Sequence, residues 1–289
     1  MRVRTLAAIL AIALLNLSCG ARAQQSANST KNTSSWNNSF LIAIQKKGGD
    51  PARAGDVKIR FYGHDAFEIT SPEGLSVLTD PWRNDSSGAF PKWFLREFPP
   101  VQVHIVVSTH AHFDHDAVGV PGGLVVLERL VGQFRLGDVE ITGLAEKHAS
   151  DPQSNEMPID NAIQIVETGG LRIAVWGDNR AKVNPALDSY LKNADVLILP
   201  IESVLTDEEV NVVLAKYEPK AVIPAHYFVR GLTTEGSGVE SVEGWVNDQE
   251  KTRHADVRRV SSADLTLNRS ELKASHRRIY YFGNHVAEN

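Results

Sequence analysis

Three histidines and an aspartate lie within six consecutive residues of this 289-residue chain, at His110, His112, Asp114 and His115. Residues 103–109, which precede them, are rich in β-branched side chains and predict a buried strand that ends in a loop. Gathering such polar groups costs free energy unless an ion binds them. His110 and His112 can face one metal ion, while Asp114 and His115 turn toward a second. The alternative is a solvated histidine-rich loop that chelates metals adventitiously.

Further histidines and aspartates follow other predicted strands. His148, Asp178 and His226 each come shortly after an apolar, β-branched segment. Loops after strands are where functional side chains tend to lie. Asp178 is either the N-cap of a helix that starts at Pro185 or a carboxylate that bridges two metals. The repeated placement of metal-ligand residue types after strands is hard to obtain by chance.

Two more residues are candidates for a supporting role. His64 lies in a turn after the first predicted strand, and a lone histidine of this kind is either structural or a neighbour of the metals. Asp80 ends the third predicted strand. It either orients a metal-bound imidazole or shapes a turn.

The first 23 residues predict an export signal. Arg2 and Arg4 precede ten apolar residues at positions 6–15, and residues 21–23 offer a small-residue cleavage site. Ten apolar residues are too few to span a bilayer, so no stable membrane span is expected. We therefore expect an exported protein, periplasmic or secreted, with lipid anchoring at Cys19 as the alternative.

Composition restricts the partners and the ligands. The formal charge is −5, and removal of residues 1–23 takes away three arginines and no acid, which leaves 27 basic against 35 acidic residues and a charge of −8. That balance argues against a nucleic-acid partner, because neutralising phosphates requires a basic face. The single cysteine, Cys19, lies in the same segment. Metal ligands must therefore be nitrogen and oxygen atoms.

Domain organisation is predicted as three parts. Residues 1–23 form the signal peptide, residues 24–54 form a flexible linker rich in Ser, Asn and Thr with one helical turn at 40–44, and residues 55–289 form one domain. The domain opens as an antiparallel meander. Its later helices are predicted at 207–217 and near 239–248, with final strands at 255–260 and 277–282.

Some features carry no assigned chemistry. Residues 83–100 contain Trp93, Phe94 and Phe98 between prolines and glycines. This flap either forms the wall of a pocket or packs into the core. The remaining histidines are assigned to the solvated surface: His104, His254, His276 and His285.

These residues together resemble the metallo-β-lactamase superfamily, over roughly residues 56–230. The stretch His110–His115 matches its His-x-His-x-Asp-His signature, and the later single His, Asp and His occur in the same order. The segments at 62–67 and 79–82 are similar to the branch that includes ascorbate-6-phosphate lactonase and N-acyl-phosphatidylethanolamine-hydrolysing phospholipase D. The resemblance implies an α/β fold of the α+β kind, a four-layer αββα sandwich.

The resemblance also implies two divalent ions per chain. Its first metal corresponds to His110, His112 and His148, its second to Asp114, His115 and His226, and Asp178 bridges them. This nitrogen-rich set suits Zn²⁺, although Mn²⁺ or Fe²⁺ also fits.

The implied reaction is hydrolysis of a small ester, lactone or phosphodiester by a hydroxide that bridges the metals. Asp114 is the expected catalytic residue, because it can orient the hydroxide and carry a proton to the leaving group. Tyr227 either donates a hydrogen bond to the oxyanion or packs in the core. Arg180 either clamps an anionic substrate or forms a surface ion pair.

Two other functions stay open. Export makes a β-lactamase the natural alternative, although the β-lactamases that resemble this pattern lack the aspartate found here at Asp178. The second alternative is a non-catalytic metal-binding module, because a fold does not fix a function.

Overall fold

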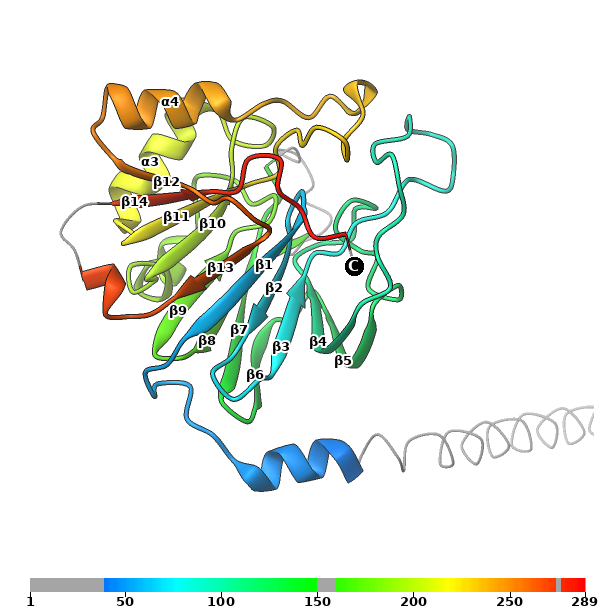
Figure 1. Ribbon diagram of the computed structural model, residues 1–289, viewed down its shortest axis with the longest axis vertical. Coiled ribbons are helices and arrows are strands. Elements are labelled where there is room, and N and C mark those ends of the chain that lie inside the picture. The colour runs from blue at the N-terminus through cyan, green and yellow to red at the C-terminus, as the bar shows by residue number, and fades with distance from the viewer. Residues whose placement is uncertain (1–38, 150–159, 274–276, 289) are drawn as a thin grey trace, which may run out of the picture. The chain divides into compact units, whose positions relative to one another are not determined.

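The computed structural model describes residues 39–149, 160–273 and 277–288 of the chain (Figure 1). The chain divides into two compact units, Met1–Lys47 and Gly48–Asn289. In the first unit, residues 39–47 are helical. The expected signal peptide and residues 24–38 of the expected linker lie outside the described residues.

The second unit begins at Gly48, seven residues before the boundary expected at 55. Residues 48–54 are tied to it by backbone hydrogen bonds. The Gly170 N–H donates to the Pro51 carbonyl (2.8 Å), and the Arg135 guanidinium donates to the Gly49 carbonyl (2.9 Å). The polar composition of this stretch hides that attachment, because the contacts use its backbone.

The first sheet has six strands in the order β13-β1-β2-β3-β4-β5. Pairing is antiparallel from β13 to β3, as the predicted meander requires, and parallel from β3 to β5. The strands are β1 (Val57–Gly63), β2 (Ala66–Thr70), β3 (Ser76–Thr79), β4 (Gln102–Ser108), β5 (Gly122–Glu128) and β13 (Asp264–Leu267).

The second sheet has eight strands in the order β12-β14-β11-β10-β9-β8-β7-β6. Strands β6 to β9 pair antiparallel, and β9, β10, β11, β14 and β12 run parallel. The strands are β6 (Gly132–Leu136), β7 (Val139–Glu146), β8 (Asn161–Thr168), β9 (Leu171–Val175), β10 (Val196–Pro200), β11 (Ala221–Ala225), β12 (Asp256–Arg259) and β14 (Arg278–Tyr281).

Helices α3 (Asp207–Tyr217) and α4 (Glu243–Lys251) lie beside the parallel half of the second sheet (Figure 1). Thr206 caps α3 through a reciprocal bond pair with Glu209, and the first turn is acidic, as its macrodipole favours. Helix α4 begins four residues later than expected. The shorter helical elements are η1 (Pro185–Leu187), α2 (Asp188–Leu191), η2 (Glu235–Ser237) and η3 (Glu271–Lys273).

The main core lies between the two sheets. Phe61 of β1 packs on Phe67 of β2 and on Phe282, which follows β14, with ring centroids 4.8 Å and 5.3 Å away. Every residue of β10 and β11 is buried. Parallel strands covered on both faces read as continuous apolar runs, which is the pattern these two show. The fold is therefore the mixed α/β, two-sheet architecture that the sequence predicts.

The connection between β3 and β4, residues 80–101, covers part of the other face of the first sheet. Phe98 packs against Tyr62 and Trp82, with ring centroids 5.5 Å and 5.2 Å away, and Phe94 stacks on Trp82 at 4.3 Å. The expected flap at 83–100 thus contributes to the core through Phe94 and Phe98. No helix is assigned within this connection, all of which is described.

Six strands end toward one edge of the molecule. The residue types that can hold metals follow the carboxyl ends of β1, β3, β4, β7, β9 and β11. Because these strands belong to both sheets, the edge where the sheets meet collects His64, Asp80, His110, His148, Asp178 and His226. In the described residues, no helix is long and apolar enough to cross a membrane.

Candidate metal centre

Asp178 lies between two groups of imidazoles, and its two oxygen atoms face different groups. Oδ2 is 3.3 Å from His148 Nε2 and 3.7 Å from His110 Nε2. Oδ1 is 3.3 Å from His115 Nε2 and 3.7 Å from His226 Nε2. A carboxylate with this arrangement can bridge two cations.

The first group contains four potential ligands whose donor atoms all lie within 4.8 Å of one another: His110, His112, His148 and Asp178. Metal–ligand bonds of about 2.0–2.1 Å in a tetrahedral site place the ligand atoms about 3.3 Å apart, so only small shifts are needed. The His112 and His148 rings are 4.6 Å apart, and His112 is exposed. The group is therefore accessible from solvent.

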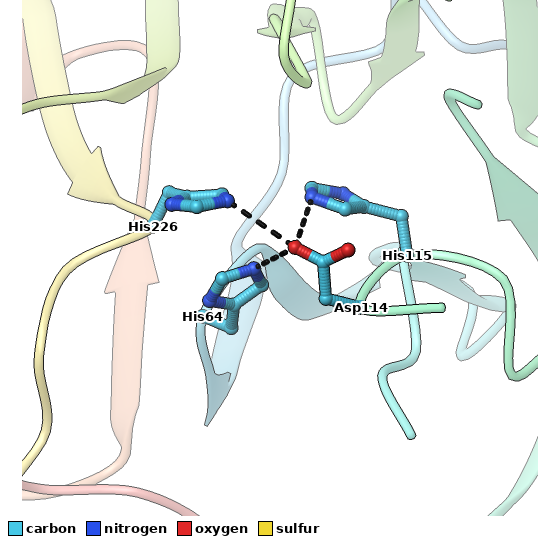
Figure 2. Close-up of side chains that lie close together, drawn as sticks. All are labelled: His64, Asp114, His115 and His226. Atoms are coloured by element: carbon cyan, nitrogen blue, oxygen red, sulfur yellow. Dashed lines mark hydrogen bonds and ion pairs between the residues drawn. The ribbon is translucent and has the colours of Figure 1, made fainter. Parts of the chain in front are cut away.

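The second group contains His64, Asp114, His115 and His226, and the three imidazoles surround the carboxylate of Asp114. Figure 2 shows three imidazoles converging on one oxygen of this carboxylate. Asp114 Oδ2 lies 2.9 Å from His64 Nε2 and 3.4 Å from both His115 Nε2 and His226 Nε2. The structure therefore brings His64, a lone histidine in the sequence, to the same centre as the seven expected ligands.

Asp80 lies behind His115, on the side away from the centre. Its Oδ2 is 3.2 Å from His115 Nδ1. Thr109 holds the carboxylate, because its backbone N–H donates to Asp80 Oδ1 (2.6 Å) and its hydroxyl donates to Oδ2 (2.8 Å). A carboxylate in this position can fix the tautomer of the imidazole so that Nε2 faces a metal.

Asp65 is a site residue that the sequence analysis did not identify. It is fully buried, and its Oδ2 lies 3.8 Å from His115 Nδ1. Within the described residues neither carboxylate oxygen has a hydrogen-bond partner. Its donor atom also groups with those of His115 and Asp178. The one sequence feature that could have identified Asp65 is its position in the turn directly after His64.

The backbone at the centre adopts uncommon conformations. His64, Asp80 and His226 have φ angles of 59°, 41° and 57°, in the left-handed region. Such residues cost about 1–3 kcal/mol each, and they gather where function requires them. Gly177, before Asp178, has φ 56°, and a Cβ there would lie 2.4 Å from Thr109 Oγ1.

The electrostatics of the centre favour bound cations. Burial lowers the pKa of His110 well below its usual value, which keeps this imidazole neutral. Burial opposes charge at Asp114 and Asp178 too, but the imidazole of His115 holds the pKa of both carboxyls well below the usual range. In return, Asp178 and Asp114 raise the pKa of His115 against the effect of burial. Both carboxyls are therefore held in the ionised form, which is the form that can bind divalent cations.

Several donor atoms of the centre have no hydrogen-bond partner within the described residues: His110 Nε2, His115 Nε2, His226 Nε2 and Asp178 Oδ1. Buried polar atoms are rarely left this way unless a water or an ion binds them. Nitrogen and carboxylate oxygen atoms at these spacings fit divalent metal ions.

Two candidates lie elsewhere. The Tyr227 hydroxyl donates to the Gly283 carbonyl (3.0 Å), and the side chain is buried beside Tyr281, so it takes the core position. Arg180 Nη2 donates to Glu146 Oε1 (2.7 Å). The structure thus places Arg180 in an ion pair and does not direct it toward a substrate.

The other histidines lie away from the centre. His254 and His285 are exposed, as expected. His104 is half-buried, and its Nδ1 accepts a hydrogen bond from the backbone N–H of Ser76 (3.2 Å between the nitrogen atoms). His276 lies outside the described residues.

A cavity of about 620 Å³ opens over the centre. Its floor includes His112, Asp114, His148, Asp178 and His226, and aromatic residues form one of its walls. A second cavity, of about 740 Å³, is lined by Glu167, Arg172, Asp195 and Lys220 and contains none of the candidate ligands. The candidate ligands therefore identify the 620 Å³ cavity as the candidate substrate site.

Known proteins resemble the chain over this same region. Residues 58–226 match the family model described as "Beta-lactamase superfamily domain". A "UPF0173 metal-dependent hydrolase" of Pyrobaculum arsenaticum is 29% identical over 198 residues, which is 59% of this chain and 84% of that protein. Another protein of that description, from Anaeromyxobacter sp. (strain K), is 27% identical over 212 residues, 61% of this chain and 76% of the relative.

Solved structures show the same fold. A protein of Thermotoga maritima described as a Zn-dependent hydrolase of the metallo-beta-lactamase superfamily superimposes with a TM-score of 0.57. It is 22% identical, and the match covers 78% of this chain and 98% of the other. A metallo hydrolase of Ignicoccus hospitalis gives a TM-score of 0.50 at 20% identity, with 74% and 98% of the two chains covered.

Proposed function

We propose that this chain, which belongs to the beta-lactamase superfamily and is a metal-dependent hydrolase, holds two divalent ions at its candidate centre. The reaction we propose is hydrolysis of a small ester, lactone or phosphodiester. We also propose, from residues 1–23, that the protein acts after export.

One observation carries the proposal. The two oxygens of Asp178 face separate imidazole groups, each 3.3–3.7 Å away. A single ion would take its ligands from one imidazole group and would leave the other group without an ion. The division of the carboxylate between two groups supports a bridged pair of ions.

The donor sets suggest how the ions are shared. His110, His112 and His148 would hold the first ion, Asp114, His115 and His226 the second, and Asp178 both. Imidazole-rich sets suit Zn²⁺, while the two carboxylates also suit Mn²⁺ or Fe²⁺. His64 and Asp65 add donor atoms beyond these seven.

When bound, the ions would lower the pKa of a coordinated water molecule and polarise the substrate oxygen. The chain's own residues supply orientation and proton transfer. Asp114 can accept a proton from the attacking water and pass it to the leaving group. The hydrogen bond between His64 Nε2 and Asp114 Oδ2 (2.9 Å) holds that carboxylate in place. Asp80 fixes the ring of His115 from behind.

The experiment combines metal analysis with hydrolysis of three reporters by the protein without residues 1–23. The reporters are a simple lactone, a bis-aryl phosphodiester and a chromogenic cephalosporin. Two ions per chain with turnover of the lactone or the phosphodiester would support the proposal. Cephalosporin turnover alone would favour a β-lactamase, and metal-replete protein inert toward all reporters would favour a binding module.

Asp114→Ala sharpens the same experiment. We expect this variant to lose hydrolysis and keep its fold, as judged by circular dichroism. Asp264→Ala is the matched control, because Asp264 is an exposed carboxylate that pairs with Arg60 at 2.7 Å and belongs to neither donor group. Full activity in Asp114→Ala would contradict the proton-transfer role.

A further inference from the structure

One wall of the cavity over the centre is aromatic. Phe90, Trp93 and Phe113 line this aromatic wall, and the Phe113 ring contacts the other two at centroid distances of 5.5 Å and 5.1 Å. Trp93 also meets the His64 ring edge-on at 6.2 Å. Since His64 bonds Asp114, the aromatic wall is directly adjacent to the centre.

Hydrogen bonds fix the backbone of the wall. Asn84 Oδ1 accepts from the N–H groups of Trp93 (2.9 Å) and Phe94 (2.8 Å), and Asn84 Nδ2 donates to the Phe94 carbonyl (3.0 Å). Asp85 Oδ2 accepts from the Phe90 N–H (3.2 Å). A wall that is ordered before binding loses little conformational entropy when a ligand arrives.

Phe90 is 56% exposed although it faces the cavity. An exposed apolar surface beside a polar centre is typical of a ligand-binding face. A planar apolar group lying against Phe90 and Phe113 would cover that surface, and rings stack favourably at such spacings.

The cavity offers little to an anionic group away from the reacting bond. Among its described lining residues, Arg83 is the one Arg or Lys side chain. Its guanidinium already donates to Asp116 through Nε (2.8 Å) and Nη2 (3.2 Å). Asp85 adds negative charge to the same lining. Recognition of a second anionic group normally requires an available Arg or Lys.

We infer that the substrate is a neutral carboxylic ester or lactone with an aromatic group next to its carbonyl, an inference that rests on the proposed function. The aromatic group lies against the aromatic wall and the carbonyl lies over the centre. Water oxygen bonds to the carbonyl carbon, the acyl C–O bond breaks, and a proton from the water goes to the leaving oxygen. The products are a carboxylic acid and an alcohol from an ester, or one hydroxy acid from a lactone. β-Lactam antibiotics carry an ionised carboxylate away from the reacting amide, and the cavity offers that group no available Arg or Lys.

The test compares two lactones whose leaving groups are both primary alcohols. Isochroman-3-one is δ-valerolactone fused to a benzene ring, with one methylene between the ring and the acyl carbon, and its leaving group is a benzylic alcohol. We expect the zinc-loaded protein to prefer isochroman-3-one by about ten-fold or more in kcat/KM, mainly through KM. Bis(4-nitrophenyl) phosphate serves as the phosphodiester comparison, because it carries aromatic groups but no carbonyl, and we expect it to be a poorer substrate than isochroman-3-one.

Phe90→Ala tests the aromatic wall directly. Phe90 is exposed and outside the core, so its loss should not unfold the protein, and we expect the ratio of kcat/KM for the two lactones to fall about ten-fold. Tyr190→Ala is the matched control, because Tyr190 is an exposed aromatic residue (42%) at the second cavity. The control should keep the wild-type ratio.

A binding measurement separates the two proposals. 2-Tetralone is isochroman-3-one with the ring oxygen replaced by carbon, so it cannot be hydrolysed. Calorimetry should show that it binds the wild type more tightly than Phe90→Ala, and that cyclohexanone binds weakly to both. Binding without any lactone turnover would support the aromatic site and overturn the proposed reaction. Turnover with no preference for the fused ring, or with a preference for the phosphodiester, would overturn the aromatic substrate alone.

Discussion

The backbone N–H of His226 donates a hydrogen bond to the carbonyl oxygen of His64 (3.0 Å), and their imidazole centroids lie 3.8 Å apart. One residue follows β11 of the second sheet and the other follows β1 of the first. Both hold left-handed backbones at a cost of about 1–3 kcal/mol each. The hydrogen bond and the packing around it keep two strained turns together at the centre.

Replacing Asp178 with Asn should remove the bridge. Asn keeps the size of the side chain but lacks the charge that two cations share. We expect metal content to fall below that of the wild type and kcat to fall by about 100-fold or more. Elemental analysis and lactone kinetics measure both. Asp264→Asn, at an exposed ion pair, should leave both unchanged, and wild-type metal content in Asp178→Asn would rule out the bridging role.

Removing the metals should destabilise the fold. Buried donor atoms such as His226 Nε2 and Asp178 Oδ1 lose the partner that offsets their burial. A ligand present at 100 times its Kd stabilises by about 2.7 kcal/mol. For a unit of this size that corresponds to a fall in Tm of roughly 5–10 °C after chelation. Calorimetry before chelation, after chelation and after return of zinc measures it, and an unchanged Tm would argue against a resident metal.

Asp80→Asn tests the orienting carboxylate behind His115. Asn tolerates the φ of 41° at this position, so the substitution isolates the charge. We expect metal affinity or kcat to fall by about 10- to 100-fold. Competition with a chromophoric chelator measures the affinity. If only the unfolding free energy changed, Asp80 would be a turn residue and nothing more.

Gly177→Ala tests the close approach beside Asp178. The added Cβ would lie 2.4 Å from Thr109 Oγ1, and φ is +56°. We expect a loss of about 1–3 kcal/mol of unfolding free energy, with weaker metal binding because Asp178 is displaced. Urea unfolding measures the first effect. Gly119→Ala is the control, since a Cβ at that position would meet no described atom within 4 Å, and equal stability of the two variants would refute the clash.

Tyr227→Phe should leave lactone turnover unchanged. Its hydroxyl donates to the Gly283 carbonyl and not to the cavity, so the substitution costs about 1 kcal/mol of stability. Kinetics and urea unfolding on one preparation measure both. A large fall in kcat with an unchanged KM would instead indicate that the Tyr227 hydroxyl donates a hydrogen bond to the oxyanion.

Much of the architecture could be predicted from the sequence. The short apolar strands and the turns between them are local features, so the meander from β1 to β3 and the apolar runs of β10 and β11 could be identified. The resemblance added the pairing of the two sheets. The boundary near Gly48 could not be predicted, because backbone hydrogen bonds hold that segment and leave no side-chain pattern.

The site was harder to complete from the sequence. The stretch His110–His115 places four metal-ligand residues within six positions, so the motif can be recognised locally. His64 contacts Asp114 in space but lies fifty residues before it in the sequence. A lone histidine in a turn gives no information about its partners. Asp65 is missed for the same reason. Arg180 and Tyr227 were ambiguous because adjacency in sequence does not determine which way a side chain points.

The centre draws on loops of both sheets: His64, His110 and Asp114 follow strands of one, and His148, Asp178 and His226 follow strands of the other. Neither sheet alone presents a complete donor set for either ion. During folding, a complete donor set can therefore form only after the sheets have docked, and contacts between residues far apart in sequence make folding slow. Metal uptake would then mark the final step of maturation, and a chain with misdocked sheets would remain without its metals.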